Sequence, residues 1–260
     1  MTYGRTPREG HLTTEARRIL RADRRGSSWP VVAETTSGLQ FTKLRGAAQG
    51  TPALIAEVIV AEIARTLGLQ VPAWCVVRLP AGVPSDDPND ELRDLLDRSA
   101  GENIGFELLE AARDVQASEA PSLDPDFAAR VLWLDTLVQN LDRTARNPNL
   151  MVRRGRYFLI DHGIAFPFHH DWNSVTEASP ARPYDASRHL FAWAAPRLAQ
   201  ATETCAPLLT RDALTAAVDA VPASLLPASL SDSAIVRRRA AYVAYLWKRL
   251  NWMVREERPA

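Results

Sequence analysis

Residues 140–163 read NLDRTARNPNLMVRRGRYFLIDHG, and this stretch decides the fold. Asp142 is followed five residues later by Asn147, and a basic turn then leads into the apolar run 157–160, which ends at Asp161. A carboxylate, an amide five residues on and a second carboxylate after a hairpin form the order that a magnesium-dependent phosphotransferase needs. The first aspartate would orient or deprotonate the acceptor hydroxyl. The amide and the second aspartate would supply oxygen ligands for Mg²⁺.

The same residues also have a plainer interpretation. An aspartate in a surface loop often forms an Asx turn, and an aspartate at the end of a strand is common. Either aspartate alone would favour this interpretation. The ordered set of three polar side chains favours catalysis instead.

Composition narrows the class of protein. The chain has 260 residues and 46% hydrophobic content, which is enough for one large domain or for two lobes with a real core. Lys+Arg and Asp+Glu are both 31, so no net basic field attracts nucleic acid, and we expect no nucleic-acid partner.

Cysteine usage and hydropathy predict the compartment. Cys75 and Cys205 are far apart and have no metal-binding spacing, which predicts reduced thiols. No run approaches eighteen apolar residues, and the N-terminus has no apolar signal core. We therefore expect a soluble cytoplasmic protein that does not enter a membrane.

The first part of the chain has strand character. The arginine-rich residues 1–23 are typical of a basic, partly mobile arm. Residues 30–44 alternate as two strands around a turn at 36–38, and 73–79 and 105–109 predict two more strands. A passage of carboxylates at 86–97 predicts a solvated helix or loop.

One long helix interrupts these strands, and it is predicted over residues 52–68. Thr51 has the side chain of an N-cap, Pro52 suits the first helical position, and Gly68 suits the position after the end.

Helical patterns dominate beyond residue 123. Residues 124–140 carry an apolar stripe, and further helices are predicted near 185–200, 210–220 and 232–256. We therefore expect an α+β protein with two lobes: a β-rich lobe over 24–112 that holds one long helix, and a mainly helical lobe over 113–260. Three aromatic residues after the second aspartate predict an anchored segment: Phe166, Phe168 and Trp172.

Lys43 lies at the end of a predicted strand, just upstream of the long helix. A lysine there could reach ATP phosphates if an acidic residue of the helix held it. Glu57 and Glu62 are the candidates, and because they are five residues apart they differ by about 140° around the helix. At most one can face Lys43, and we place Glu57 ahead. The alternative is a lysine whose stem covers apolar surface beside an exposed glutamate.

Two further groups carry weaker signals. Gly26, Ser27 and Ser28 precede the first strand of the hairpin, and such a turn offers backbone N–H groups and hydroxyls to phosphate. Arg143 follows the first aspartate, where it could steady the loop, meet phosphate charge or lie at the surface.

With these residues placed, the chain resembles the HipA-like kinase family. The resemblance rests on Asp142-Arg143-x-x-x-Asn147 as the catalytic loop, on Ile160-Asp161-His162-Gly163 as the metal-binding motif, and on Lys43 with Glu57. It covers most of residues 24–172. Thr144 stands where the family has histidine.

The resemblance implies a kinase-like fold, with ATP and Mg²⁺ as cofactors and ATP between the lobes. It places the adenine near a linker at Leu109 to Ala112, with Leu109 and Ala111 as contact residues, and it implies transfer of phosphate to Ser or Thr of a protein acceptor. In some members a serine of the phosphate loop is itself phosphorylated, which directs attention to Ser27 and Ser28.

Two other functions stay open from the sequence. One is a pseudokinase that acts as an interaction module, which nucleotide binding without phosphate transfer would indicate. The other is a kinase on the same fold that acts on a small-molecule alcohol or sugar, which a tailored acceptor pocket would indicate.

Overall fold

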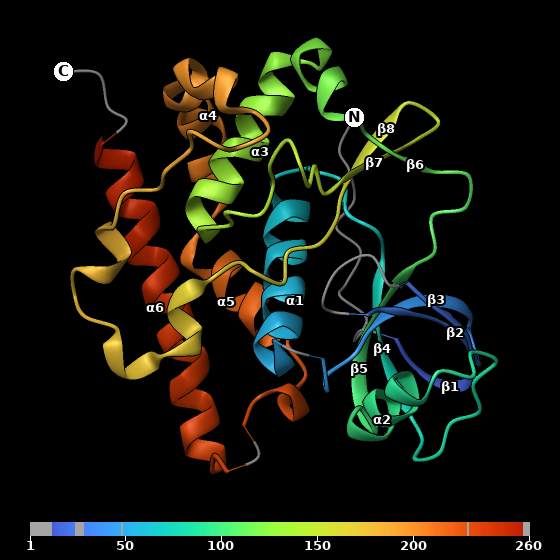
Figure 1. The fold of residues 1–260 in the computed structure, drawn as a ribbon. Helices are drawn as coiled ribbons and strands as arrows, with labels where there is room; N and C mark the ends of the chain where they lie inside the picture. The colour runs from blue at the N-terminus through green and yellow to red at the C-terminus, as the bar shows by residue number, and fades with distance from the viewer. Residues whose placement is uncertain (1–11, 24–28, 48, 228, 257–260) are drawn as a thin grey trace, which may run out of the picture. The chain divides into compact units, whose positions relative to one another are not determined.

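The computed structural model describes residues 12–23, 29–47, 49–227 and 229–256. The chain divides into two compact units of mixed α/β structure (Figure 1). Unit 1 comprises residues 1–47 and 73–107, and unit 2 comprises residues 48–72 and 108–260. Among the described residues, no helix combines the length and the apolar character that a membrane crossing requires.

Unit 1 is a closed five-stranded barrel with the strand order β1-β2-β3-β5-β4. All neighbours are antiparallel except β1 and β4, which run parallel. The β2–β3 hairpin turns at Gly38, whose φ of +104° suits a residue without a side chain. The strands are β1 (Thr13–Ala22), β2 (Val31–Thr35), β3 (Gly38–Lys43), β4 (Trp74–Leu79) and β5 (Gly101–Glu107).

Strand β1 lies where the sequence predicts a basic arm over 1–23. Thr14, Ala16 and Ile19 are buried, while the arginines between and beside them are exposed. The register with β2 shifts between Ala16 and Arg18, so the buried positions do not keep a strict alternation. The prediction of an arm is wrong for Thr13–Ala22, because the outward arginines and this shift hide the strand pattern.

A short helix, α2 (Asp90–Arg98), packs on the barrel core. Asn89 caps it by accepting a hydrogen bond from the backbone N–H of Leu92 at 2.9 Å. Leu92, Leu95 and Leu96 form its buried face. The carboxylates at 86–97 therefore include the solvated side of a helix, one of the two structures that the sequence predicts.

Unit 2 contains the long helix α1 (Gly50–Thr66). It begins after Gln49, with no side-chain cap, so the prediction of Thr51 as N-cap is wrong; Gly68 follows its end with a φ of +70°, as predicted. Helix α1 packs against α5 (Arg211–Asp219), also in unit 2. This grouping differs from the expected lobe over 24–112, which includes the helix.

Helix α3 (Pro125–Val138) carries the predicted apolar stripe. Two residues explain why the helix begins here. Asp124 caps it by accepting a hydrogen bond from the N–H of Phe127 at 2.7 Å, and Pro125 occupies the first helical position. It ends at Gln139, which has a left-handed φ of +57°. The remaining elements of unit 2 are β6 (Arg113–Asp114), β7 (Leu150–Arg153), β8 (Arg156–Leu159), α4 (Leu198–Cys205), α6 (Asp232–Glu256) and several short 3-10 turns.

The last helix, α6, donates hydrogen bonds to the C-terminal end of α3. Arg249 is fully buried and donates hydrogen bonds to the carbonyls of Thr136 (2.6 Å), Leu137 (2.9 Å), Pro180 (3.0 Å) and Arg182 (2.8 Å). The final carbonyls of a helix lack partners within the helix, and a cation is favoured there. Burial lowers the pKa of Arg249 to about 10, so the guanidinium stays charged at neutral pH.

The anchored segment predicted after Asp161 packs against α6. His169 is buried within it, and its Nδ1 lies 3.0 Å from the hydroxyl oxygen of Tyr242. Burial, and after it the charge of His170, lower the pKa of His169 to about 3. The ring is therefore uncharged at neutral pH. Its aromatic partners include Phe166, Phe168 and Tyr242. Trp172 packs on Tyr242, and Tyr245 stacks on Phe168.

We predict that Arg249→Lys lowers the free energy of unfolding by about 2–4 kcal/mol, because one ammonium cannot replace a fork that serves four carbonyls. Urea unfolding followed by tryptophan fluorescence measures the change. Arg255→Lys, in the exposed last turn of the same helix, is the control and should change stability by less than about 0.5 kcal/mol. If Arg249→Lys lowered the free energy of unfolding by an equally small amount, the four hydrogen bonds of Arg249 would not stabilise the fold as proposed. We call this contact the Arg249 clamp.

His169 should make stability depend on pH. Its pKa in the folded protein lies below the unfolded value of about 6.5, so its contribution is complete above pH 6.5 and is lost as the pH falls toward 3. We expect protonation linked to His169 to lower the free energy of unfolding by about 1.5 kcal/mol as the pH falls from 6.5 to 5. His169→Phe should flatten the decline by that amount in urea unfolding at the two pH values. His170→Gln should keep most of the decline, since burial lowers the pKa of His169 more than the charge of His170 does.

Candidate functional site

The first candidate carboxylate, Asp142, lies in the loop between α3 and β7. Its backbone N–H donates to Oδ1 of Asn140 at 3.1 Å, and the side chain of Asn140 in turn donates to Oδ1 of Asp135 at 3.1 Å. The N–H of Asn140 also bonds the carbonyl of Asp135 at 2.9 Å. The loop is therefore attached to the last turn of α3 before it reaches Asp142.

Two asparagines hold the carboxylate of Asp142. The Nδ2 atoms of Asn147 and Asn149 both donate to its Oδ2, at 2.7 Å and 3.1 Å. A carboxylate accepts hydrogen bonds and does not donate them, so each amide turns its NH₂ group toward Asp142. The amide oxygen of Asn147 is consequently directed away from Asp142. The structure thus unites the predicted pair Asp142 and Asn147, and it adds Asn149.

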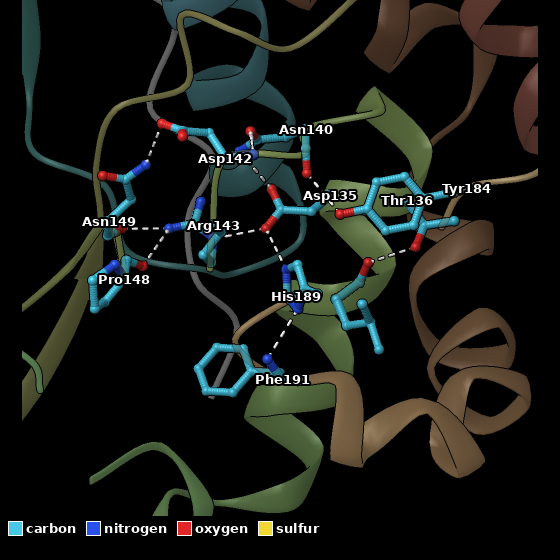
Figure 2. A network of polar contacts seen from close by, with 11 residues as sticks. Asp135, Thr136, Asn140, Asp142, Arg143, Pro148, Asn149, Tyr184, His189 and Phe191 are labelled. Atoms are coloured by element: carbon cyan, nitrogen blue, oxygen red, sulfur yellow. Dashed lines mark hydrogen bonds and ion pairs between the residues drawn. The ribbon is translucent and has the colours of Figure 1, made fainter. Parts of the chain in front are cut away.

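Arg143 is fully buried, which excludes a surface position. Its Nε donates to Oδ2 of Asp135 at 2.6 Å, and its Nη1 donates to the backbone carbonyl of Asn149 (Figure 2). Of the roles that the sequence left open, these contacts support steadying the loop. The guanidinium ties the first residues of the loop to its last residues and to α3.

Asp135 is the shared acceptor of this network, and it is fully buried. Burial by itself would raise the pKa of its carboxyl, but the charge of Arg143 and the hydrogen bond from His189 outweigh that effect and hold the pKa well below its usual range. The carboxylate is therefore ionised. Tyr184 also supports the loop, because its hydroxyl donates a hydrogen bond to the carbonyl of Asn140 at 2.6 Å.

His189 reaches the network from a distant part of the chain. The N–H of Phe191 donates to its Nδ1 at 3.0 Å, so the ring carries its proton on Nε2 and donates it to Oδ2 of Asp135 at 2.9 Å. The backbone adds an antiparallel bridge between His189 and Thr144, in which the N–H of Leu190 donates to the carbonyl of Arg143 at 2.9 Å. Residues 189–191 clamp the loop through both backbone and side chain.

Asp135 and His189 did not emerge from the sequence as site residues. The signal for Asp135 is a carboxylate beside the apolar stripe of a helix, since a buried charge requires a partner. No comparable signal exists for His189, because its partners lie 45 and 54 residues away in the chain.

The second candidate carboxylate, Asp161, follows the β7–β8 hairpin. Leu150 pairs with Leu159, and the N–H of Ile160 donates to the carbonyl of Asn149 at 3.1 Å. The hairpin therefore brings the end of the Asp142 loop and the start of the Asp161 segment together at its base. This is the arrangement that the order of residues in 140–163 predicts.

The backbone around the site adopts sparsely populated conformations. Asp161 has a φ of +58° and Asn149 a φ of +46°, and Gln139 and Phe166 are also left-handed. Such strain persists where the surroundings over-determine the backbone, and it is concentrated at functional sites. The segment after Asp161 is held by Glu57 of α1, whose Oε1 accepts a hydrogen bond from the N–H of His162 at 2.9 Å.

The remaining predicted residues are located as follows. Lys43 is buried at the end of β3 in unit 1, opposite Ile104, whereas Glu57 belongs to unit 2. Their pairing stays a prediction. Leu109 accepts a hydrogen bond from the N–H of Ala112 at 3.1 Å in a turn where Ala111 has a φ of +57°. Gly26, Ser27 and Ser28 lie outside the described residues.

The donor set suits magnesium. Asn147 and Asp161 offer an amide oxygen and a carboxylate, which are the hard oxygen ligands that Mg²⁺ prefers. In the described part of the chain, no group of three or more His, Cys, Asp or Glu residues forms a metal cage of its own. Mg²⁺ is commonly bound by one or two carboxylates together with substrate phosphates and water.

Comparison with known proteins identifies the family of the chain. The chain matches the family model described as HipA-like kinase over residues 16–223. Its structure is similar to that of a Helicobacter pylori proinflammatory kinase, CtkA, with a TM-score of 0.57 and 9% sequence identity over 91% of this chain and 93% of that chain. At this identity the likeness shows a shared fold alone. None of the curated proteins matches the chain. Because the family model spans most of its length, the chain belongs to the HipA-like kinase family and is a kinase.

Proposed function

We propose that the protein transfers the γ-phosphoryl group of ATP, with Mg²⁺, to a Ser or Thr hydroxyl of a protein. The observation that carries the proposal is the carboxylate of Asp142, which Asn147 and Asn149 hold at one oxygen. A side chain fixed in this way is suited to orient an acceptor hydroxyl and to accept its proton.

Asn147 and Asp161 would hold the metal through the amide oxygen and the carboxylate. When bound, Mg²⁺ neutralises charge that develops on the phosphoryl group. Lys43, paired with Glu57, would contact the phosphates, and Arg143 would act by keeping the loop in place. These roles follow from the residue types and from the contacts of the loop within unit 2.

The expectations for nucleotide binding remain part of the proposal. We propose a two-lobed kinase in which Gly26, Ser27 and Ser28 cradle phosphate and Leu109 with Ala111 lines the adenine. Ser27 and Ser28 are also the proposed sites of autophosphorylation. Cys75 and Cys205 are free and buried, which supports a reducing compartment such as the cytoplasm.

We predict that Asp142→Ala and Asp161→Ala each reduce phosphate transfer by at least about 100-fold, because a general base and a metal ligand are removed. Incubation with γ-labelled ATP and Mg²⁺, followed by phosphosite mapping, measures the transfer. Asp161→Ala should also weaken the Mg²⁺-dependent rise in melting temperature with ATP, whereas Asp142→Ala should retain it.

Asp94→Ala, on the exposed face of α2, is the matched control and should transfer phosphate like the wild type. Wild-type turnover in either site variant would contradict the assignment. Label on a Ser or Thr of a protein supports the proposed acceptor. ATP binding by the wild type without any label would point to a pseudokinase, whereas transfer to a small-molecule alcohol or sugar alone would point to a small-molecule kinase.

His189 should act on catalysis through Asp135. We expect His189→Ala to lower kcat about tenfold with little change in KM for ATP, because it removes a hydrogen bond to a buried charge and loosens the loop. His189→Gln can place an amide N–H near the position of Nε2 and should recover much of the loss. Equal losses in both variants would show that the ring fills space and does not position the loop.

A further inference from the structure

The face of α1 that carries Glu57 lies against the segment 161–163. Glu57 is 1% exposed, and His162, whose N–H it accepts at 2.9 Å, is 2% exposed. A buried backbone N–H needs an acceptor, and a side-chain oxygen of a helix provides one at a fixed position. The amide that follows Asp161 is thus anchored directly to a helix.

Gly163 shows how closely this segment approaches α1. A Cβ atom at Gly163 would lie 3.3 Å from the Cβ of Ala53, 3.3 Å from Oε1 of Glu57 and 3.6 Å from Oε1 of Gln49. Gln49, Ala53 and Glu57 are spaced by four residues and lie on one face of the helix. Only a residue without a side chain fits this approach without displacing a neighbour.

The anchor lies beside a strained residue. Asp161 has a φ of +58°, a conformation that a non-glycine residue keeps only where its surroundings hold it. The preceding side is held by the hydrogen bond from Ile160 to Asn149 at 3.1 Å. The following side is held by Glu57, so the carboxylate of Asp161 is presented between two fixed amides.

We infer that Glu57 is a positioning residue for Asp161: by accepting the N–H of His162 it holds the segment 161–163 in the conformation that binds the metal. The inference rests on the proposed function for the role of Asp161. It gives Glu57 a second task besides the proposed pairing with Lys43. The two tasks differ chemically, because pairing needs the charge of Glu57 whereas the N–H needs only an acceptor oxygen.

Three variants separate the tasks. Glu57→Ala removes both the charge and the acceptor, and Glu57→Gln removes the charge but keeps an oxygen for the N–H of His162. Glu62→Gln is the matched control, because it neutralises a carboxylate of the same helix that binds Arg65 at 2.8 Å. Gly163→Ala disturbs the same contact from the other side.

The first measurement is residue-level hydrogen exchange of the nucleotide-free protein. We expect the His162 amide to exchange about tenfold faster or more in Glu57→Ala. Glu57→Gln should stay within about threefold of the wild type, and Glu62→Gln should not change the rate. An unchanged rate at Leu246 of α6 shows that the effect is local. If Glu57→Ala does not fold, Gly163→Ala should show the faster exchange in its place.

The second measurement is the Mg²⁺ concentration that gives half of the thermal stabilisation by ATP. It should be about tenfold higher in Glu57→Ala than in Glu57→Gln, because both variants lack the charge and only Glu57→Gln keeps the acceptor oxygen, and saturating Mg²⁺ should bring the turnover of Glu57→Ala close to that of Glu57→Gln. Loss of packing alone would not produce this split between metal affinity and turnover.

Wild-type exchange of the His162 amide in Glu57→Ala would overturn the inference, and so would equal exchange in Glu57→Gln and Glu57→Ala. If the wild type binds Mg²⁺-ATP and transfers phosphate in that case, the proposed function stands and only the role of Glu57 falls. A wild type that does not bind Mg²⁺-ATP would overturn the proposed function itself, while hydrogen exchange would still test the contact.

Discussion

The buried carboxylate of Asp135 is the interaction on which the candidate site depends. Removing a carboxylate from water costs several kcal/mol, and here the charge of Arg143 and hydrogen bonds from three side chains offset that cost. The arrangement stabilises the fold only while all partners are present, since loss of one leaves a buried charge without compensation. The same partners define the position of the loop that carries Asp142. Stability and site geometry are therefore coupled through one carboxylate.

The network also explains how a loop can hold a reactive group in place. Asn140, Arg143 and Asn149 have left the regular helix and are not yet in the strand, so no ladder of backbone bonds fixes them. Arg143 and His189 replace that ladder, because they join α3, the loop and residues 189–191. Asp142 then needs only two amides to fix one of its oxygens. The second carboxylate is held differently, by a hairpin on one side and a helix on the other.

The sequence predicted those features that depend on local pattern. Helix α3 followed from an apolar stripe, and β8 followed from a short apolar run that ends in Asp161. The pair Asp142 and Asn147 followed from a spacing of five residues. By contrast, His189 is defined by contacts with residues far away in the chain, and such pairings leave no periodicity to detect. Strand β1 was missed because a register shift breaks its alternation.

The clamp made by Arg249 has a consequence for the order in which the protein is built. A ribosome makes α3 and both candidate carboxylates more than eighty residues before it makes Arg249. Until α6 has emerged, the carbonyls of Thr136 and Leu137 lack this donor, and the turn that carries Asp135 is not held from that side. The turn that carries Asp135 is therefore held from both sides only after the segment with Arg249 has been made, and not when its own residues emerge.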